Sequence, residues 1–462
     1  MRAAGAGILC ALALAACGGG RQADGGLAWE ECGARLECAT LAVPIDYGHP
    51  EGKTLELALV RLPAADPGRR IGSLVLNPGG PGQSGVELVR AGVTAFFGEE
   101  VGRRFDIVGF DPRGVGESSP ISCHDDLAAL LAADPSPDSA HEAEAVTALT
   151  DAFVETCTKR HGDVLPFLGT VSAARDLDRI REALGDEKLT YVGFSYGTRL
   201  GSVYAHLFPE RVRALVLDGG VHPGAGLDQT SRDGAHALER ALERFFAECR
   251  ADDACPIGPR PEAVWERAQA RAERTEEPGL FYLGARLLLY DHELGWPVLG
   301  LALESAGKGN DSVLRATAGL AFPVKSNALE AGFAVYCADE AARLTGAEYL
   351  ELVRGLERDF PRLGFTGAGG CFAGWPAHAE PLPRVRAAGA PPILVVGTTH
   401  DPATPYAWSQ ALADALDSGV LVTLDGDGHT ALPARNACIA TLVEAYLIDL
   451  AVPAAGTVCR AG

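Results

Sequence analysis

The chain has 462 residues, enough for one large domain with an insertion or for two ordinary domains. Hydrophobic residues make up 47% of it and charged residues 22%, a globular balance that excludes a disordered or fibrous chain. The formal net charge of −21 would repel phosphate backbones and anionic lipid headgroups, so we expect no nucleic-acid partner.

The N-terminal residues have the pattern of an export signal. An apolar run from Ile8 to Ala16 follows a charged start and is too short to span a bilayer. It ends in Leu14-Ala15-Ala16-Cys17, which resembles a bacterial lipobox, where the cysteine is lipidated. We therefore expect a signal peptide over residues 1–16, lipidation of Cys17 and a flexible tether over residues 17–30.

The expected location follows from this signal. A lipidated protein would be exported and held at the cell envelope, facing the periplasm or the cell surface, with the N-terminal anchor as its membrane contact. The alternative is an ordinary signal peptide cleaved after small residues, which would give a secreted protein.

The twelve cysteines also favour an oxidising compartment, because no CxxC pair or Cys/His cluster with zinc spacing accompanies them. Without Cys10 and Cys17 an even number remains, as disulfides require. The simplest pairing is sequential, and the alternative is a set of buried thiols. The remaining cysteines are Cys32, Cys38, Cys123, Cys157, Cys249, Cys255, Cys337, Cys371, Cys438 and Cys459.

Short apolar runs alternate with amphipathic stretches along the chain. Ala173 to Leu184 and Cys438 to Leu450 each have an apolar stripe at helical spacing. Strands that alternate with helices predict an α/β fold with a mainly parallel central sheet flanked by helices. The predicted strands are Leu55–Leu62, Ser73–Asn77, Phe105–Phe110, Leu189–Phe194, Ala214–Asp218, Pro392–Gly397 and Val420–Leu424.

A glycine-rich loop, Asn77 to Gly85, follows the second of these strands. Its glycines would let main-chain N–H groups point at a ligand, as an oxyanion hole requires. Without a GK[ST] sequence the segment is not a P-loop, and the alternative is a tight turn. A further loop contains Asp111 and Arg113, which we expect to brace the neighbouring loops rather than contact substrate.

The strongest signal for catalysis is Gly193-Phe194-Ser195-Tyr196-Gly197, between a predicted strand and the helix-like stretch Thr198 to Phe208. A serine at such a strained turn is presented above the sheet, where it can act as a nucleophile. We therefore predict that Ser195 is the nucleophile, with the main-chain N–H groups of Gly80 and Tyr196 as the oxyanion hole. The alternative is a serine that caps a helix.

The strand and helix alternation stops between the fifth and sixth predicted strands. This stretch is mostly helix-like, and the strand signal returns at Pro392. We interpret residues 221–390 as a helical cap inserted into one α/β-hydrolase core, which comprises residues 31–220 and 391–462.

A nucleophilic serine needs a base and an acid that orients the base. Asp401 follows the strand that starts at Pro392, and His429 lies in a glycine-rich loop after the last predicted strand, so we predict that they are the acid and the base. The rival residues are His400 for the base, and Asp425 or Asp427 for the acid.

Together these segments resemble the α/β-hydrolase serine peptidases, in particular the exported tripeptidyl aminopeptidases related to prolyl aminopeptidases. The resemblance rests on NPGGPGQSG, DIVGFDPRGVGES, SAARDLDRIREALG, YVGFSYGTRLG, GTTHDPATP and DGDGHT, and covers essentially the whole mature chain. It implies a helical cap, a triad of Ser195, Asp401 and His429, and an exopeptidase that acts through an acyl-enzyme.

The resemblance also implies the substrate. It predicts peptides with a free N-terminus and no metal or organic cofactor. The sequence does not give the oligomeric state. Pro78 stands where the prolyl branch has histidine in HGGPG, which favours release of tripeptides. Asp339 and Glu340 are candidates to bind the substrate amine, but a surface pair is as good an interpretation. A carboxylesterase with the same triad is the alternative function.

Overall fold

The computed structural model describes residues 26–92, 96–320, 326–433 and 436–461. The predicted signal peptide, Cys17 and most of the predicted tether lie outside the described residues.

In the described residues, ten strands form one sheet in the order β1-β2-β3-β5-β4-β6-β7-β8-β9-β10. The pairs β1 with β2, β2 with β3 and β3 with β5 are antiparallel, and all other neighbours are parallel. The strands are β1 (Glu30–Gly33), β2 (Leu36–Pro44), β3 (Thr54–Leu62), β4 (Gly72–Asn77), β5 (Phe105–Phe110), β6 (Leu189–Phe194), β7 (Val212–Asp218), β8 (Ile393–His400), β9 (Gly419–Asp427) and β10 (Thr457–Arg460).

This is the α/β-hydrolase fold with the mainly parallel sheet that the sequence predicts. All seven predicted strands are present, from β3 to β9. The prediction missed β1, β2 and β10, which lie at the two edges of the sheet.

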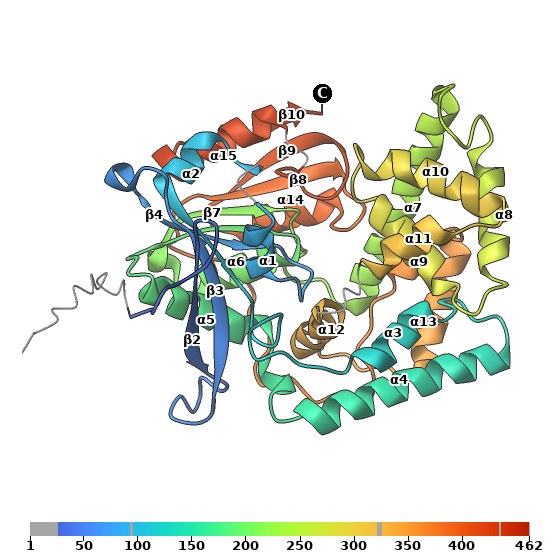
Figure 1. The fold of residues 1–462 in the computed structure, drawn as a ribbon, viewed down its shortest axis with the longest axis horizontal. Coiled ribbons are helices and arrows are strands. Elements are labelled where there is room, and N and C mark those ends of the chain that lie inside the picture. Colours follow the sequence, from blue (N-terminus) through green and yellow to red (C-terminus); the bar gives the residue numbers. More distant parts are fainter. Residues whose placement is uncertain (1–25, 93–95, 321–325, 434–435, 462) are drawn as a thin grey trace, which may run out of the picture.

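Helices cover both faces of the sheet (Figure 1), because alternate residues of each central strand point to opposite sides. Val75 belongs to one hydrophobic core, whereas Leu74 and Leu76 belong to the other. The first core includes α5 (Thr170–Ala183), α6 (Tyr196–Leu207) and α14 (Tyr406–Ala415), and the second includes α1 (Gly85–Arg90), α2 (Glu99–Arg104) and α15 (Ala437–Asp449).

A helical region lies beside the sheet (Figure 1) and has a hydrophobic core of its own. Most of it comes from the chain between β7 and β8. However, α3 (His124–Ala132) and α4 (Ala140–His161), from the connection between β5 and β6, also pack against helices of this region. The other helices are α7 (Leu227–Ala251), α8 (Pro261–Ala272), α9 (Gly279–Leu288), α10 (Gly295–Gly307), α11 (Ser312–Gly319), α12 (Ala328–Asp339) and α13 (Gly346–Asp359), and short 3-10 turns occur at Pro67–Arg69, Leu165–Phe167, Pro209–Arg211 and Gly364–Gly367.

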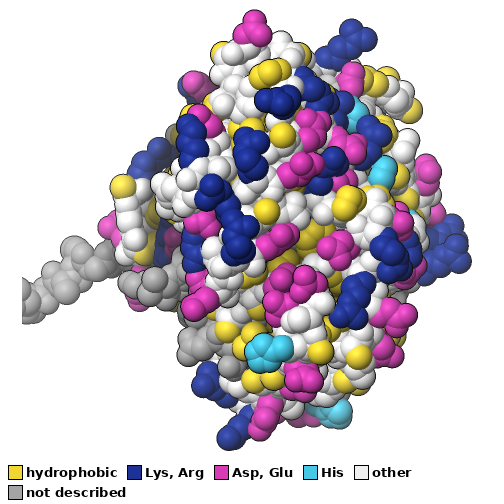
Figure 2. Space-filling view, turned by 90° about the vertical axis from the view of Figure 1, so that its right-hand side faces the viewer, with side chains coloured by type: hydrophobic (Ala, Val, Ile, Leu, Met, Phe, Trp, Pro, Cys, Tyr) yellow, Lys and Arg dark blue, Asp and Glu magenta, His cyan; other side chains and the backbone are white. Residues whose placement is uncertain are grey.

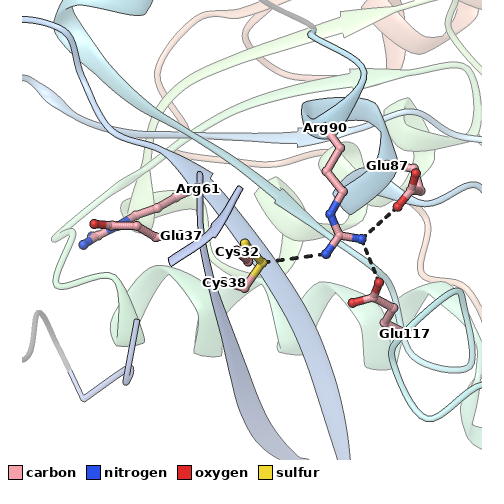
Figure 3. The surroundings of a disulfide bond; sticks show 7 residues. All are labelled: Cys32, Glu37, Cys38, Arg61, Glu87, Arg90 and Glu117. Carbon is pink, nitrogen blue, oxygen red and sulfur yellow. Dashed lines mark hydrogen bonds and ion pairs between the residues drawn. A yellow bond between two sulfur atoms is a disulfide. The ribbon is translucent and has the colours of Figure 1, made fainter. Parts of the chain in front are cut away.

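The ten cysteines within the described residues form five disulfides, and their pairing is the predicted sequential one. Two of them fasten the edges of the sheet, Cys32–Cys38 between β1 and β2 and Cys438–Cys459 between α15 and β10. Figure 3 shows the first, with the guanidinium of Arg90 beside Cys38. The other pairs are Cys123–Cys157, Cys249–Cys255 and Cys337–Cys371.

The surface mixes both signs of charge. On the face drawn in Figure 2, acidic and basic side chains alternate, with small groups of hydrophobic side chains between them. Within the described ranges, none of the helices combines the length and the hydropathy needed to cross a bilayer.

Candidate active site

Ser195 lies at the turn between β6 and α6 and has a strained backbone, with φ 53° and ψ −121°. Its main-chain N–H donates to the carbonyl of Asp218 at the end of β7, at 2.8 Å. The turn is crowded, since a Cβ added to Gly193 would lie 2.3 Å from the carbonyl oxygen of Gly197. A Cβ added to Gly197 would likewise lie 2.8 Å from the carbonyl oxygen of Asn77, so glycine is required on both sides of the serine, as in a nucleophile elbow.

His429 and Asp401 form a close pair after the neighbouring strands β8 and β9. Nδ1 of His429 lies 2.9 Å from each carboxylate oxygen of Asp401. With Nδ1 on the acid, Nε2 is the nitrogen that can face the serine. Both Ser195 and His429 line one cavity, although in the described structure the Ser195 hydroxyl makes no hydrogen bond to the imidazole. Such contacts are often loose without substrate.

The carboxylate of Asp401 is held by its own loop. Its side chain is fully buried and accepts from the main-chain N–H groups of Ala403 and Thr404, both at 2.8 Å. It also accepts from the Thr404 hydroxyl at 3.0 Å and from the N–H of Thr430 at 3.2 Å. These donors fix the direction in which the acid faces the imidazole.

The charges around His429 suit a general base. Burial lowers the pKa of the imidazole, but the charge and hydrogen bond of Asp401, together with the charge of Asp218, outweigh burial and raise the pKa above its ordinary value. Ionised His429 is therefore stabilised after it accepts a proton.

Asp218 is a residue that the sequence analysis missed as part of the site. Its buried carboxylate accepts from the main-chain N–H groups of Ala431 and Leu432, in the loop that carries His429. Burial raises its pKa to about 6, against the opposing effect of these two hydrogen bonds. The signal that could have found it is an acidic residue at the carboxyl end of a buried strand, at the edge where Ser195 and Asp401 were expected.

The rival residues have other partners. Asp427 forms a bidentate ion pair with Arg244. Asp425 accepts a hydrogen bond from the Thr399 hydroxyl at 3.3 Å. His400, whose pKa is lowered by burial, does not contact the serine or line its cavity in the described part of the chain. The geometry therefore favours Asp401 and His429 over these alternatives.

The glycine-rich loop after β4 lies directly against the serine turn. A Cβ on Gly79 would come within 2.4 Å of the Phe194 carbonyl oxygen and 3.1 Å of the Tyr196 nitrogen. Gly80 and Tyr196 line the cavity with Ser195, and among the described residues their N–H groups have no acceptor. Both N–H groups are thus available to a developing oxyanion.

The cavity above Ser195 has a volume of about 430 Å³ and continues into a second one of about 180 Å³. The two share a wall made of Thr230, Arg286, Tyr336, Ala403 and Trp408. Among the described residues that line them there are two arginines, Arg199 and Arg286, and no Asp or Glu.

The two candidate amine-binding carboxylates do not line these cavities in the described structure. The largely buried Asp339 side chain accepts from the N–H of Thr170 at 2.7 Å and lies 3.8 Å from Arg199. Glu340 accepts from the N–H of Ala342 within its own turn. In the described structure, both carboxylates therefore bind groups of the protein itself and do not line the cavities.

The loop after β5 is braced as expected. The fully buried Arg113 donates two hydrogen bonds to Asp176 and others to main-chain carbonyls. Asp111 accepts from the Ser84 hydroxyl and from the N–H groups of Val86 and Glu117. These contacts connect the loops beneath the site.

Two known protein families together match most of the chain. Residues 72–270 match the family described as alpha/beta hydrolase fold, and residues 366–459 match the family described as TAP-like protein.

The chain is also similar to curated proteins over most of its length. It is 39% identical to serine protease Hip1 of Mycobacterium tuberculosis, over 91% of this chain and 87% of that protein. It is 33% identical to the tripeptidyl aminopeptidase of Streptomyces coelicolor, over 96% and 88%. Carboxylesterase B of Mycobacterium tuberculosis is 35% identical, over 91% and 86%.

Proposed function

The chain belongs to the α/β-hydrolase family, in the TAP-like group of serine hydrolases, and on that premise we propose that it is an exported serine exopeptidase releasing short peptides, in particular tripeptides, from peptide N-termini. The observation that carries the proposal is the Asp401–His429 pair at 2.9 Å, whose imidazole lines the same cavity as the strained Ser195. The peptidase relatives support a peptide substrate.

The proposed mechanism follows from the orientation of the groups. Nε2 of His429 takes the Ser195 proton, the oxygen attacks the scissile carbonyl, and Asp401 stabilises the imidazolium. The N–H groups of Gly80 and Tyr196 bind the oxyanion, and the protonated His429 then gives its proton to the leaving amine. Water, activated by the same imidazole, attacks the acyl-enzyme and releases the N-terminal fragment.

The helices that surround the cavity would limit substrate length. Thr230 of α7, Arg286 of α9 and Tyr336 of α12 line it together with Ser195, so the proposed cap of residues 221–390 contributes part of the wall. Helices on one side of the cavity would favour the short ends of peptides over the middle of a folded chain.

Carboxylesterase activity is a second candidate, because a specific observation favours it. Among the described residues that line the two cavities, no carboxylate is present to bind an α-amine, and one relative is named carboxylesterase B. An ester needs no such group.

The deciding experiment is hydrolysis of matched anilides of one, two and three residues, each with a free or an acetylated N-terminus, by wild type and Ser195→Ala. Serine-dependent cleavage confined to free amines supports the aminopeptidase, and the preferred length tests the tripeptide assignment. Cleavage that ignores the amine overturns it in favour of an esterase or an endopeptidase.

Export and lipidation of Cys17 are part of the proposal. The five disulfides support an oxidising compartment, and the lipobox-like sequence at residues 14–17 supports the anchor. Mass spectrometry of the mature N-terminus tests this, with Cys17→Ser as the control. An unmodified N-terminus that begins at another residue would contradict lipidation.

A further inference from the structure

Arg286 of α9 lies in the wall between the cavity at Ser195 and its extension. It is close to the proposed catalytic base, because the main-chain carbonyl of Tyr290, one turn further along the chain, accepts the main-chain N–H of His429 at 2.8 Å. The rings of Tyr290 and His429 are 5.2 Å apart. A group bound by Arg286 would therefore belong to the molecule that Ser195 attacks.

The guanidinium is held in place by neutral partners. Its Nε donates to the Tyr290 hydroxyl at 3.0 Å, and Nη1 donates to the carbonyl oxygen of Thr366 at 3.1 Å. A guanidinium has five N–H donors, so three remain without an acceptor among the described residues. The side chain is thus fixed in direction and still able to donate.

Arg286 also differs from its neighbours in having no acidic partner within the described ranges. Arg199, the other arginine of the cavity, lies 3.8 Å from Asp339, and Arg244 near the loop of His429 pairs with Asp427. A partly buried cation without a counter-ion is costly, and an anionic ligand group would offset that cost.

We propose that Arg286 binds a carboxylate of the substrate, so that the enzyme selects peptides that carry one near the scissile bond. The carboxylate is either an Asp or Glu side chain or the α-carboxylate of a short peptide, since a guanidinium binds both in the same two-bond geometry. The inference rests on the proposed peptidase function. It assigns part of the specificity to a residue that neither the triad nor the oxyanion hole includes.

The test uses paired peptides with a free N-terminus. In one arm Glu replaces Gln at each position near the scissile bond, and in the other a C-terminal carboxylate replaces an amide. Wild type should prefer the carboxylate in at least one arm by about 10- to 100-fold in kcat/KM, mainly through KM. The arm that shows the preference identifies the source of the carboxylate.

Three variants assign the preference to the residue. Arg286→Gln should reduce it to within about 3-fold, and Arg286→Lys should retain part of it, because the charge stays while the two-bond geometry is lost. Arg267→Gln, on an exposed position of α8, is the matched control and should keep the preference. Labelling of Ser195 by a fluorophosphonate shows that each variant is folded.

Failure of this inference can be told from failure of the peptidase proposal. If wild type cleaves neutral peptides but shows no preference, or if Arg286→Gln keeps the preference, the role of Arg286 is overturned. If wild type cleaves no peptide but cleaves esters, the peptidase proposal fails instead. The carboxylate preference is then read from 4-nitrophenyl esters of glutaric and pentanoic acid, with the same expected effect of Arg286→Gln.

Discussion

The main-chain N–H of Ser195 donates to the main-chain carbonyl of Asp218 at 2.8 Å. The carboxylate of the same aspartate accepts the N–H groups of Ala431 and Leu432, at 2.9 and 2.8 Å. One residue at the end of β7 therefore connects the turn of the proposed nucleophile to the loop of the proposed base. Asp218 is fully buried and does not itself line the described cavity above Ser195.

This connection predicts a shift in the pH profile. Ionised Asp218 raises the pKa of His429, so Asp218→Asn should lower it. The base works only when neutral, so activity falls as the pH drops through this pKa, and the acid limb of kcat/KM should move to lower pH in the variant. Both enzymes are assayed on the same ester. An acid limb that stays at the wild-type pH in Asp218→Asn, or moves to higher pH, would contradict the electrostatic role of Asp218.

Asp401 should act by fixing the tautomer of His429. Asp401→Asn keeps the shape but offers an N–H to Nδ1, which places the imidazole proton on Nε2, facing the serine. We expect kcat to fall by about 10⁴-fold with little change in the urea midpoint. The matched control is Asp425→Asn, a rival acid that contacts Thr399, and it should stay within about 2-fold of wild type. The reverse pattern would move the acid to Asp425.

The sequence predicted the elements of the site better than their connections. Ser195, Asp401 and His429 each follow a continuous apolar strand, and parallel strands bring their carboxyl ends to one edge. Such a signal is local and can be read from a single segment. The contacts of Asp218 with Ala431 and Leu432 span more than two hundred residues and leave no local pattern.

Contacts between distant segments also explain why the sequence did not predict β10 or the packing of α3 and α4. The strand β10 has four residues, of which only Cys459 is buried, and it is held by pairing with β9 and by the disulfide to Cys438. The packing of α3 against α9 and of α4 against α13 is likewise a tertiary contact. Neither follows from the spacing of apolar residues.

The close approach of Gly79 to the serine turn predicts a large effect of one methyl group. In Gly79→Ala the added carbon would lie 2.4 Å from the Phe194 carbonyl oxygen, at a φ of +94°. The loop must then move away, and we expect the rate of fluorophosphonate labelling of Ser195 to fall by about 100-fold.

The effect should come from the clash with the serine turn and not from the strain of a positive φ in alanine. A substitution at Gly389 distinguishes these two causes. It has a φ of +89°, and an added Cβ would meet nothing within 4 Å. Gly389→Ala should cost about 1–2 kcal/mol of stability and leave the labelling rate unchanged. Equal losses of labelling in the two variants would show that the approach of Gly79 to the turn is not what matters.

The disulfides should differ in their contribution to stability because they close loops of different length. Cys337–Cys371 spans 34 residues and Cys32–Cys38 spans 6. In the chain-entropy model, removing the first by a double alanine substitution should cost about 4 kcal/mol, and removing the second about 2 kcal/mol. Urea unfolding of the two variants under oxidising conditions measures both values.

The position of the Cys337–Cys371 disulfide also predicts an effect on substrate binding. Cys337 lies on α12, which also carries Tyr336 in the cavity wall, whereas Cys32 and Cys38 fasten the far edge of the sheet, at β1 and β2. Loss of Cys337–Cys371 should therefore raise KM for peptides, because the wall is less well fixed, while loss of Cys32–Cys38 should leave KM unchanged. A larger loss of stability on removing Cys32–Cys38 than on removing Cys337–Cys371 would contradict the entropy argument. A rise in KM on removing Cys32–Cys38 but not Cys337–Cys371 would contradict the assignment of α12 to the substrate site.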